Sequence, residues 1–169
     1  MNKICCLVFS FFLLFSLVSC FGSAKKYDYV SLSKKSFSAE LCGEWYGTQI
    51  EARIEMREAQ GGTRDFYIQF LSGSLSGVIV RREGEKVKIS IGGVEERDFW
   101  AGGLCDIAKI LCPEECALIR ADKNGETGVF SAKVGDCAFY ITVRADGVPK
   151  SFENDGNFSL KVKDFSLVK

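Results

Sequence analysis

The sequence contains no histidine at all. This absence excludes catalysis by an imidazole base, as in Ser-His-Asp and Cys-His enzymes, and it excludes metal sites with histidine ligands. None of the remaining residues has a spacing that assembles a nucleophile, a base and a third orienting group. We therefore expect a protein that is not an enzyme and that uses no cofactor and no metal ion.

Net charge is also absent, because 22 Lys and Arg residues balance 22 Asp and Glu residues. Nucleic-acid binding depends on a basic excess or patch that neutralises phosphates, so we expect no nucleic-acid partner. The chain is 47% hydrophobic and 26% charged. This composition is typical of a globular protein and excludes a largely disordered one. At 169 residues, one domain is the expected number.

The longest apolar run lies at the N-terminus, where residues 4–18 follow Lys3 and precede Ser19-Cys20. A run of about fifteen residues has the length of a signal-peptide core and is short for a membrane span. Small residues directly before a cysteine resemble the bacterial lipobox. The resemblance implies cleavage before Cys20 and its acylation with fatty acids such as palmitate. The alternative is an uncleaved membrane anchor in which Cys20 has no role.

The lipobox resemblance implies three segments. Residues 1–19 are a lipoprotein signal peptide, residues 20–38 a lipidated tether, and residues 39–169 the folded body. The tether is rich in Ser and Lys and shows no apolar periodicity, which is typical of a linker. The expected location is the bacterial cell envelope, on the outer membrane or on the periplasmic face of the inner membrane, with the N-terminal lipid as the contact to the membrane.

The body shows the alternation of β-strands. In the first strand, Ile50, Ala52 and Ile54 fall on one face, and Glu51 and Arg53 fall on the other. Period two is typical of a half-buried strand in an antiparallel sheet, and glycine-containing turns separate the later strands at hairpin spacing. The pattern predicts about eight strands, at residues 43–56, 66–70, 75–82, 87–91, 117–121, 128–134, 138–144 and 158–165.

One mid-chain segment, residues 99–112, has helical character. Only Asp106 and Lys109 are clearly polar in its second half, and Pro113 ends it. A helix that is apolar nearly all round must be covered on several sides, and the concave face of a curved sheet is the expected cover. The sequence therefore predicts an α+β fold, in which an antiparallel curved sheet of about eight strands, a half-barrel, covers a central apolar helix.

The order of these elements resembles that of LolA/LolB-like proteins. A long amphipathic strand follows the tether, hairpins and an apolar helix come next, and Ile141–Pro149 and Leu160–Phe165 end the chain as a strand, a turn with proline and a final strand. The resemblance covers most of the chain after Cys20. It implies a half-barrel cavity that binds a hydrophobic ligand, such as an acyl chain, a lipid or a lipoprotein anchor.

The candidate lining of such a cavity combines the helix with inward-facing strand residues. Its members are Ile50, Ile54, Phe66, Ile68, Phe70, Val87, Ile89, Phe99, Trp100, Leu104, Ile107, Ala108 and Leu111. Hydrophobic-ligand binding is the leading hypothesis for function. The alternative is a structural or assembly lipoprotein whose cavity is filled by its own helix and which acts through protein–protein contacts.

Five cysteines follow Cys20, and this odd number leaves at least one thiol free or paired between chains. Cys112 and Cys116 flank the end of the predicted helix and are candidates for a local disulfide. Plain buried thiols are the alternative, since free cysteine packs like a small apolar residue. A zinc site of four cysteines is disfavoured, because the sequence has no Cys-x-x-Cys pair.

Overall fold

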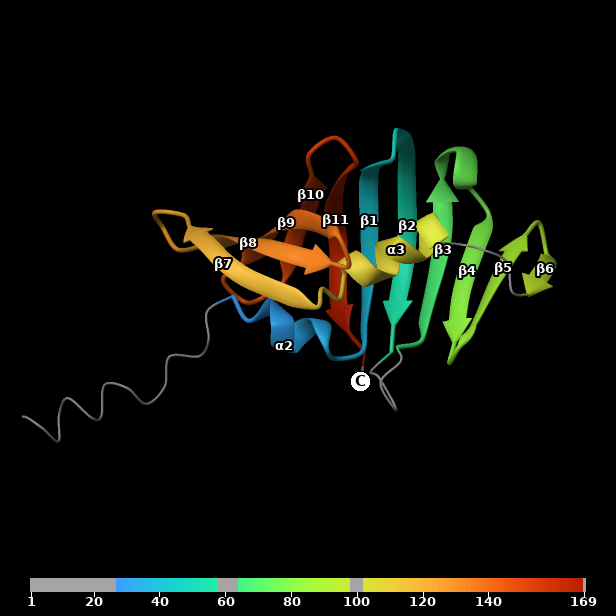
Figure 1. The fold of residues 1–169 in the computed structure, drawn as a ribbon, viewed down its shortest axis with the longest axis horizontal. Helices are drawn as coiled ribbons and strands as arrows, with labels where there is room; N and C mark the ends of the chain where they lie inside the picture. The colour runs from blue at the N-terminus through green and yellow to red at the C-terminus, as the bar shows by residue number, and fades with distance from the viewer. Residues whose placement is uncertain (1–26, 58–63, 98–101, 169) are drawn as a thin grey trace, which may run out of the picture.

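The structure is a computed structural model that describes residues 27–57, 64–97 and 102–168. Its main feature is one antiparallel sheet of eleven strands, in the order β6-β5-β4-β3-β2-β1-β11-β10-β9-β8-β7. Figure 1 shows an open, curled sheet in which β7 and β8 turn across the face that also carries the longer helix. Successive strands pair throughout, and the pairing of β1 with β11 joins the two halves of the chain.

The elements have the following bounds. The strands are β1 (Phe37–Trp45), β2 (Thr48–Met56), β3 (Phe66–Ser72), β4 (Val78–Glu83), β5 (Lys86–Ile91), β6 (Val94–Arg97), β7 (Glu115–Ala121), β8 (Thr127–Val134), β9 (Cys137–Arg144), β10 (Pro149–Asn154) and β11 (Phe158–Leu167). The helices are α2 (Tyr29–Ser33) and α3 (Gly102–Ile110), with a 3₁₀ turn at Gly73–Leu75.

The predicted α+β class is wrong, because the sheet dominates the fold and α3 is only nine residues long. The predicted eight strands omit β1, β6 and β10. The first of these begins in the segment assigned to the tether. The second is four residues long and mostly charged, and the third begins at Pro149. Proline is accepted at the first residue of a strand, but it removes the usual strand signal.

The alternation predicted for the first long strand is confirmed in β2. Ile50, Ala52, Ile54 and Met56 are buried, while Arg53 between them is exposed. The inward-facing residues of the other strands join them in one hydrophobic cluster, which also contains residues of α3. The core therefore lies between the concave face of the sheet and the helix that crosses it (Figure 1).

The segment from Tyr27 to Ser38, which we assigned to the tether, is part of the packed body. Tyr29 in α2 has no exposed surface, and the backbone N–H of Tyr27 donates to the carbonyl of Ala145 at 3.2 Å. The Asp28 side chain caps α2 by accepting from the N–H of Ser31. A five-residue helix is too short to show a period, so the sequence pattern could not reveal it.

In the part of the chain that the structure describes, no helix has the length and apolar character needed to span a membrane.

Candidate functional site

The residues predicted to line a hydrophobic cavity lie on the concave face, in the cluster shared with α3. The buried members are Ile50, Ile54, Phe66, Ile68, Phe70, Ile89, Ile107, Ala108 and Leu111. Val87 and Leu104 are partly buried and pack against the same cluster. Phe99, Trp100 and the predicted lipidation site Cys20 lie outside the described residues. The structure thus brings the described strand and helix candidates together as mutual packing partners.

The helix α3 fills this face with its own side chains. Ile107 and Leu111 have no exposed surface, and Ala108 and Ile110 are each 2% exposed. Lys109 is on the outer side, where it pairs with Asp106 at 2.7 Å. The apolar character that suggested a hydrophobic-ligand cavity in the sequence is therefore used in contacts within the chain.

The C-terminal end of α3 is fixed by the N-terminal helix. The Tyr29 hydroxyl donates to the carbonyl oxygen of Leu111 at 2.6 Å, and the Cys112 thiol donates to the carbonyl of Ser33 at 3.4 Å. Burial raises the pKa of Tyr29 well above its usual value, and the nearby thiols of Cys112 and Cys116 raise it further. A neutral hydroxyl at this position can act as a stable donor to the end of the helix.

The two cysteines of the predicted disulfide are free thiols in the structure. Burial raises the pKa of Cys112 to about 11 and that of Cys116 to about 11, so both are protonated at neutral pH. Their oxidation to a disulfide stays a prediction. In the described ranges, no group of three or more His, Cys, Asp or Glu side chains is placed to hold a metal ion.

A surface cleft lies beside α3, where the turn between β1 and β2 meets the turn between β8 and β9. Its volume is about 320 Å³, within the range of ligand and side-chain binding pockets. We call it the aromatic cleft, because Trp45, Tyr46 and Phe158 form one wall. The rest of the lining combines four charged residues with four uncharged ones: Asp106, Lys109, Ile110, Glu114, Val134, Gly135, Asp136 and Cys137.

The aromatic wall has a defined geometry. The rings of Trp45 and Phe158 lie 5.0 Å apart, and the ring of Tyr46 meets that of Trp45 edge-on at 5.1 Å. The Tyr46 backbone N–H donates to the carbonyl of Asn157 at 2.7 Å, which ties the β1–β2 turn to the start of β11. Trp45 is buried, whereas Tyr46 keeps 55% of its surface exposed. The pair therefore presents one anchored and one accessible ring.

The turn that carries Tyr46 is strained. Tyr46 has φ of +47° and Gly47 has φ of +76°, as a two-residue hairpin turn with positive φ at both positions requires. Asparagine or glycine usually occupies the first position, because a bulky side chain in the left-handed region costs about 1–2 kcal/mol. Such outliers are concentrated at functional sites, where the surrounding structure holds them in place.

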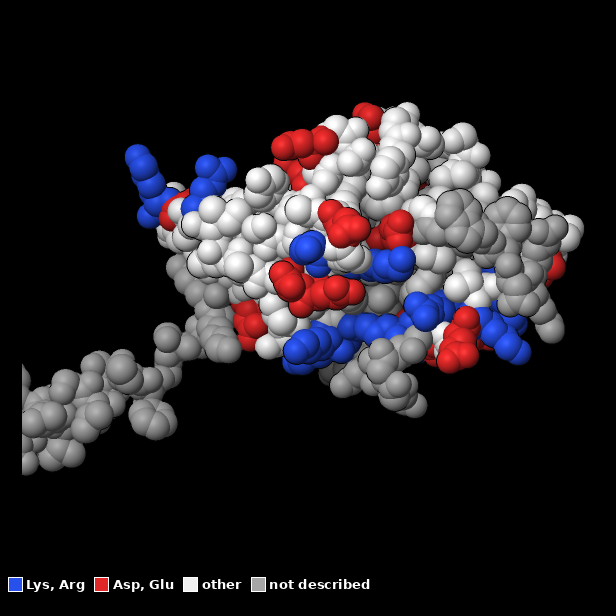
Figure 2. All heavy atoms as spheres, viewed as in Figure 1, with Lys and Arg blue, Asp and Glu red and all other residues white. Residues whose placement is uncertain are grey.

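The charges around the aromatic cleft leave a negative excess. Asp106 is neutralised by Lys109, whereas Glu114 and Asp136 have no ion pair with any side chain in the described parts of the chain. Figure 2 shows acidic side chains in the middle of this face, over the region of α3, with basic side chains between them and along the lower edge. Burial raises the pKa of the Tyr46 hydroxyl, and Cys137 and Asp106 add to that rise.

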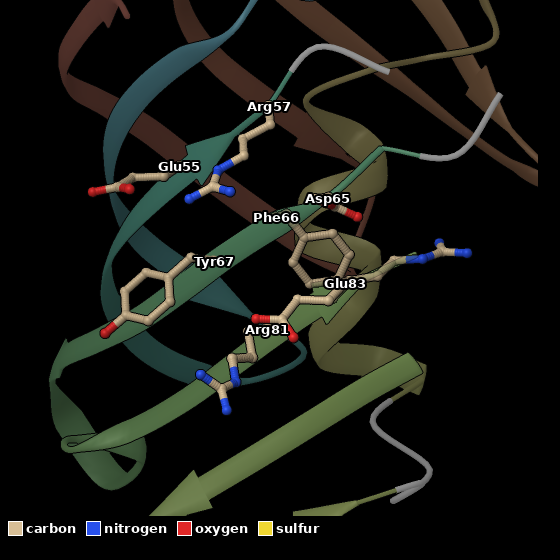
Figure 3. Close-up of a pocket in the computed structure, with 8 residues that line it drawn as sticks. Glu55, Arg57, Asp65, Phe66, Tyr67, Arg81 and Glu83 are labelled. Carbon is tan, nitrogen blue, oxygen red and sulfur yellow. The ribbon is translucent and has the colours of Figure 1, made fainter. Parts of the chain in front are cut away.

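A second hollow lies across β2, β3 and β4 (Figure 3). Its volume is about 200 Å³, and it is lined by Glu55, Arg57, Asp65, Phe66, Tyr67, Arg81, Arg82 and Glu83. Several of these charges already have partners: Arg81 pairs with Glu95 at 2.7 Å, and Asp65 accepts from the N–H of Gly84 at 2.7 Å. Balanced charge and small volume make this hollow a weaker site than the aromatic cleft.

The aromatic cleft was not predicted from the sequence. We placed Tyr46 inside a strand, because tyrosine is common in strands and rare at the positive-φ position of a turn. The available signal was the Gly47 that follows two aromatic residues. Asp106, Glu114 and Asp136 are separated along the chain, so the local sequence pattern does not show that they line one cleft.

No family model and no curated protein matches this chain. Solved structures do resemble it. An uncharacterized conserved protein from Thermus thermophilus is 18% identical, with a TM-score of 0.52 over 84% of this chain and 85% of that one. Because its TM-score exceeds 0.5, this likeness shows a shared fold and nothing beyond the fold.

Two further structures have lower scores. A putative outer membrane lipoprotein-sorting protein domain from Vibrio parahaemolyticus is 10% identical, with a TM-score of 0.46 over 85% of this chain and 92% of that one. A chain of the Pseudomonas aeruginosa MucA/MucB complex is 16% identical, with a TM-score of 0.45 over 82% of this chain. This chain spans about half of that one, 54% of its length.

Proposed function

We propose that this protein is a non-enzymatic lipoprotein of the bacterial cell envelope that acts by binding a partner protein. Its anchor is the acylated Cys20 that the lipobox resemblance implies. The binding surface is the aromatic cleft, and the concave face of the sheet has a structural role. The observation that carries the proposal is the complete burial of Ile107 in α3, and of Leu111 directly after it, within the core of the sheet.

This burial supports partner binding over a lipid-carrying role for an energetic reason. A ligand on the concave face would have to displace α3. Exposing Ile107, Ile110 and Leu111 costs about 1.5–3 kcal/mol for each side chain. A domain of this size is stable by only about 5–15 kcal/mol, so opening the helix would consume much of that stability.

The aromatic cleft suits a protein partner of a particular chemistry. Aromatic residues are enriched in protein interfaces, where they supply contact area at little cost in conformational entropy. The unpaired carboxylates of Glu114 and Asp136 favour a cation, and the exposed face of Tyr46 can hold one by a cation–π contact. The partner segment therefore carries a lysine or arginine side chain that enters the cleft.

Photo-crosslinking in living cells of the source organism tests this proposal. Tyr46 is replaced by p-benzoylphenylalanine, which keeps an aromatic ring at the cleft. The matched control places the same group at Tyr140 on β9, which is 47% exposed and outside the aromatic cleft. We expect a protein adduct specific to position 46, attached through a basic segment of the partner.

Two charge variants sharpen the test. Glu114→Gln and Asp136→Asn keep the size of each side chain and remove its charge, so each should weaken the adduct formed at position 46. Equal adducts at positions 46 and 140, or a lipid adduct at position 46 in place of a protein, would contradict the proposal. A lipid adduct would instead favour the hydrophobic-ligand hypothesis.

A further inference from the structure

The strand β7 at the end of the sheet has an unusual number of exposed apolar side chains. It pairs with β8 on one side only, and its other edge is free of strands within the described sheet. Leu118 is 51% exposed and Ile119 is 54% exposed, and Ala117 before them is exposed as well. An exposed apolar edge strand marks a contact surface.

The N-terminal segment enters the folded body beside this strand. Gly128 on β8 shows the proximity, because a Cβ atom placed on it would lie 3.0 Å from Leu118 Cδ1 and 3.3 Å from Tyr27 Cγ. The side chains of Leu118 and Tyr27 therefore both lie close to the same glycine. Figure 1 shows the first described residues and the β7–β8 hairpin at one end of the molecule, with β5 and β6 at the opposite end.

The length of the connection limits how far the lipid anchor can be from β7. Six residues, 21–26, separate Cys20 from Tyr27. A fully extended chain spans at most about 3.6 Å per residue, so the anchor lies within about 25 Å of Tyr27. Given the acylated Cys20 of the proposed function, the β7 end of the body must stay close to the bilayer surface.

We propose that β7 rests on the bilayer that holds the Cys20 acyl chains, with Leu118 and Ile119 entering its interfacial region. This inference rests on the proposed lipid anchor. Arg120 and Lys123 follow the two apolar residues and are exposed, so their side chains can reach lipid phosphates. Apolar side chains next to basic ones are the usual composition of a surface that lies in a membrane interface.

The backbone of β7 favours a bilayer over a further strand as its neighbour. The pairing of β7 with β8 shifts register between Leu118 and Arg120, which leaves Ile119 as the extra residue of a bulge. A bulge bends an edge strand and disrupts its ladder of hydrogen bonds, which disfavours strand addition by a second copy or by a partner. A fluid surface does not require a regular ladder.

The test is lipid photo-labelling of the full, acylated chain in liposomes of phosphatidylethanolamine and phosphatidylglycerol that contain a diazirine phospholipid. Labelled peptides are mapped by mass spectrometry. The matched region is the hairpin of β5 and β6, where Ile91 and Val94 are 61% and 69% exposed at the far end of the sheet. We expect labels in residues 117–121 and none above background in residues 91–94.

Variants test whether the side chains themselves make the contact. Leu118→Asp and Ile119→Asp should reduce the labelling of β7 to the background level, whereas Ile91→Asp should leave it unchanged. Equal labelling of the two regions, or crosslinks between the β7 strands of two copies in place of lipid labels, would overturn the inference.

The same mass spectra separate this inference from the proposed anchor. An N-terminal peptide that begins at Cys20 with its acyl groups, together with an unlabelled β7, overturns the membrane contact alone. A chain without acyl groups on Cys20 overturns the proposed anchor, and the inference about β7 is then overturned with it.

Discussion

The hydrogen bond from Tyr29 to Leu111 provides a sharp test of how the N-terminal segment stabilises α3. Tyr29 is fully buried, and its hydroxyl donates to the Leu111 carbonyl at 2.6 Å. This carbonyl is at the C-terminal end of α3, where the last carbonyl groups of a helix have no N–H donors within the helix. Tyr29→Phe keeps the ring, which packs edge-on against Phe152 at 6.1 Å, and removes only the donor.

The expected cost follows from the carbonyl that is left behind. A buried acceptor without a partner costs about 1–3 kcal/mol, and that is a large part of a stability of about 5–15 kcal/mol. Urea unfolding followed by circular dichroism measures the difference. The control is Tyr140→Phe, since Tyr140 is 47% exposed and a surface change of this kind stays within about 0.5 kcal/mol.

The outcome that refutes this prediction is simple to recognise. If Tyr29→Phe and Tyr140→Phe unfold at the same urea concentration, the bond to Leu111 does not hold α3 in place. The assignment of Tyr27–Ser38 to the packed body would then rest on apolar contacts alone. If only Tyr29→Phe is destabilised, a folded fragment of this protein must begin before Tyr29.

Three further predictions concern the core, the thiols and the sheet. Leu111→Asp should unfold the domain in a thermal melt, because an unpaired buried carboxylate costs several kcal/mol. Leu104→Asp should stay folded, because Leu104 is only partly buried. Equal melting temperatures for the two variants would contradict the packing of the helix against the sheet. Because burial raises the pKa of Cys112 and Cys116 from 9.0 to about 11, the folded state favours their neutral form, so stability is full below about pH 9 and falls as the pH rises towards 11. Urea titrations of reduced protein across that range check this, and an unchanged slope in Cys112→Ala would argue against it. Gly43→Ala should destabilise the sheet by about 1–3 kcal/mol or more. Gly43 has a φ of +145°, and the added Cβ would lie 2.1 Å from the carbonyl oxygen of Ser159 on β11. An unchanged urea midpoint would show that β1 and β11 pair differently.

Some parts of the fold are encoded in local patterns, and these could be predicted. The alternation of Ile50, Ala52 and Ile54 predicts β2 and its buried face, and the apolar residues around Asp106 predict that α3 is covered. Such patterns depend on neighbours two to four residues apart. Such patterns predict burial in any fold that packs another element against the apolar face.

Other parts depend on contacts between distant segments, and the sequence did not reveal them. Tyr29 lies in a five-residue helix whose stability comes from Leu111, 82 residues further along the chain. Strand β6 is charged and four residues long, so it is recognisable only by its pairing with β5. The aromatic cleft requires both turns and α3 to meet, which local pattern cannot show.

The strand count affected the functional prediction as well. In the predicted half-barrel of about eight strands, the helix and the inward-facing strand residues were expected to line a ligand cavity. The observed sheet has eleven strands, with β7 and β8 turned across its concave face, so the nine residues of α3 suffice to complete the core. The described candidate lining residues pack against one another in the hydrophobic cluster.

The proposed function depends most on whether α3 alone, and no lipid, occupies the concave face. Native mass spectrometry of the full chain, purified from membranes in a mild detergent, tests this occupancy most directly. We predict the mass of the chain with its covalent acyl groups on Cys20 and no additional bound lipid. A second species that carries one non-covalent lipid in a fixed ratio, retained after detergent is removed in the gas phase, would contradict it.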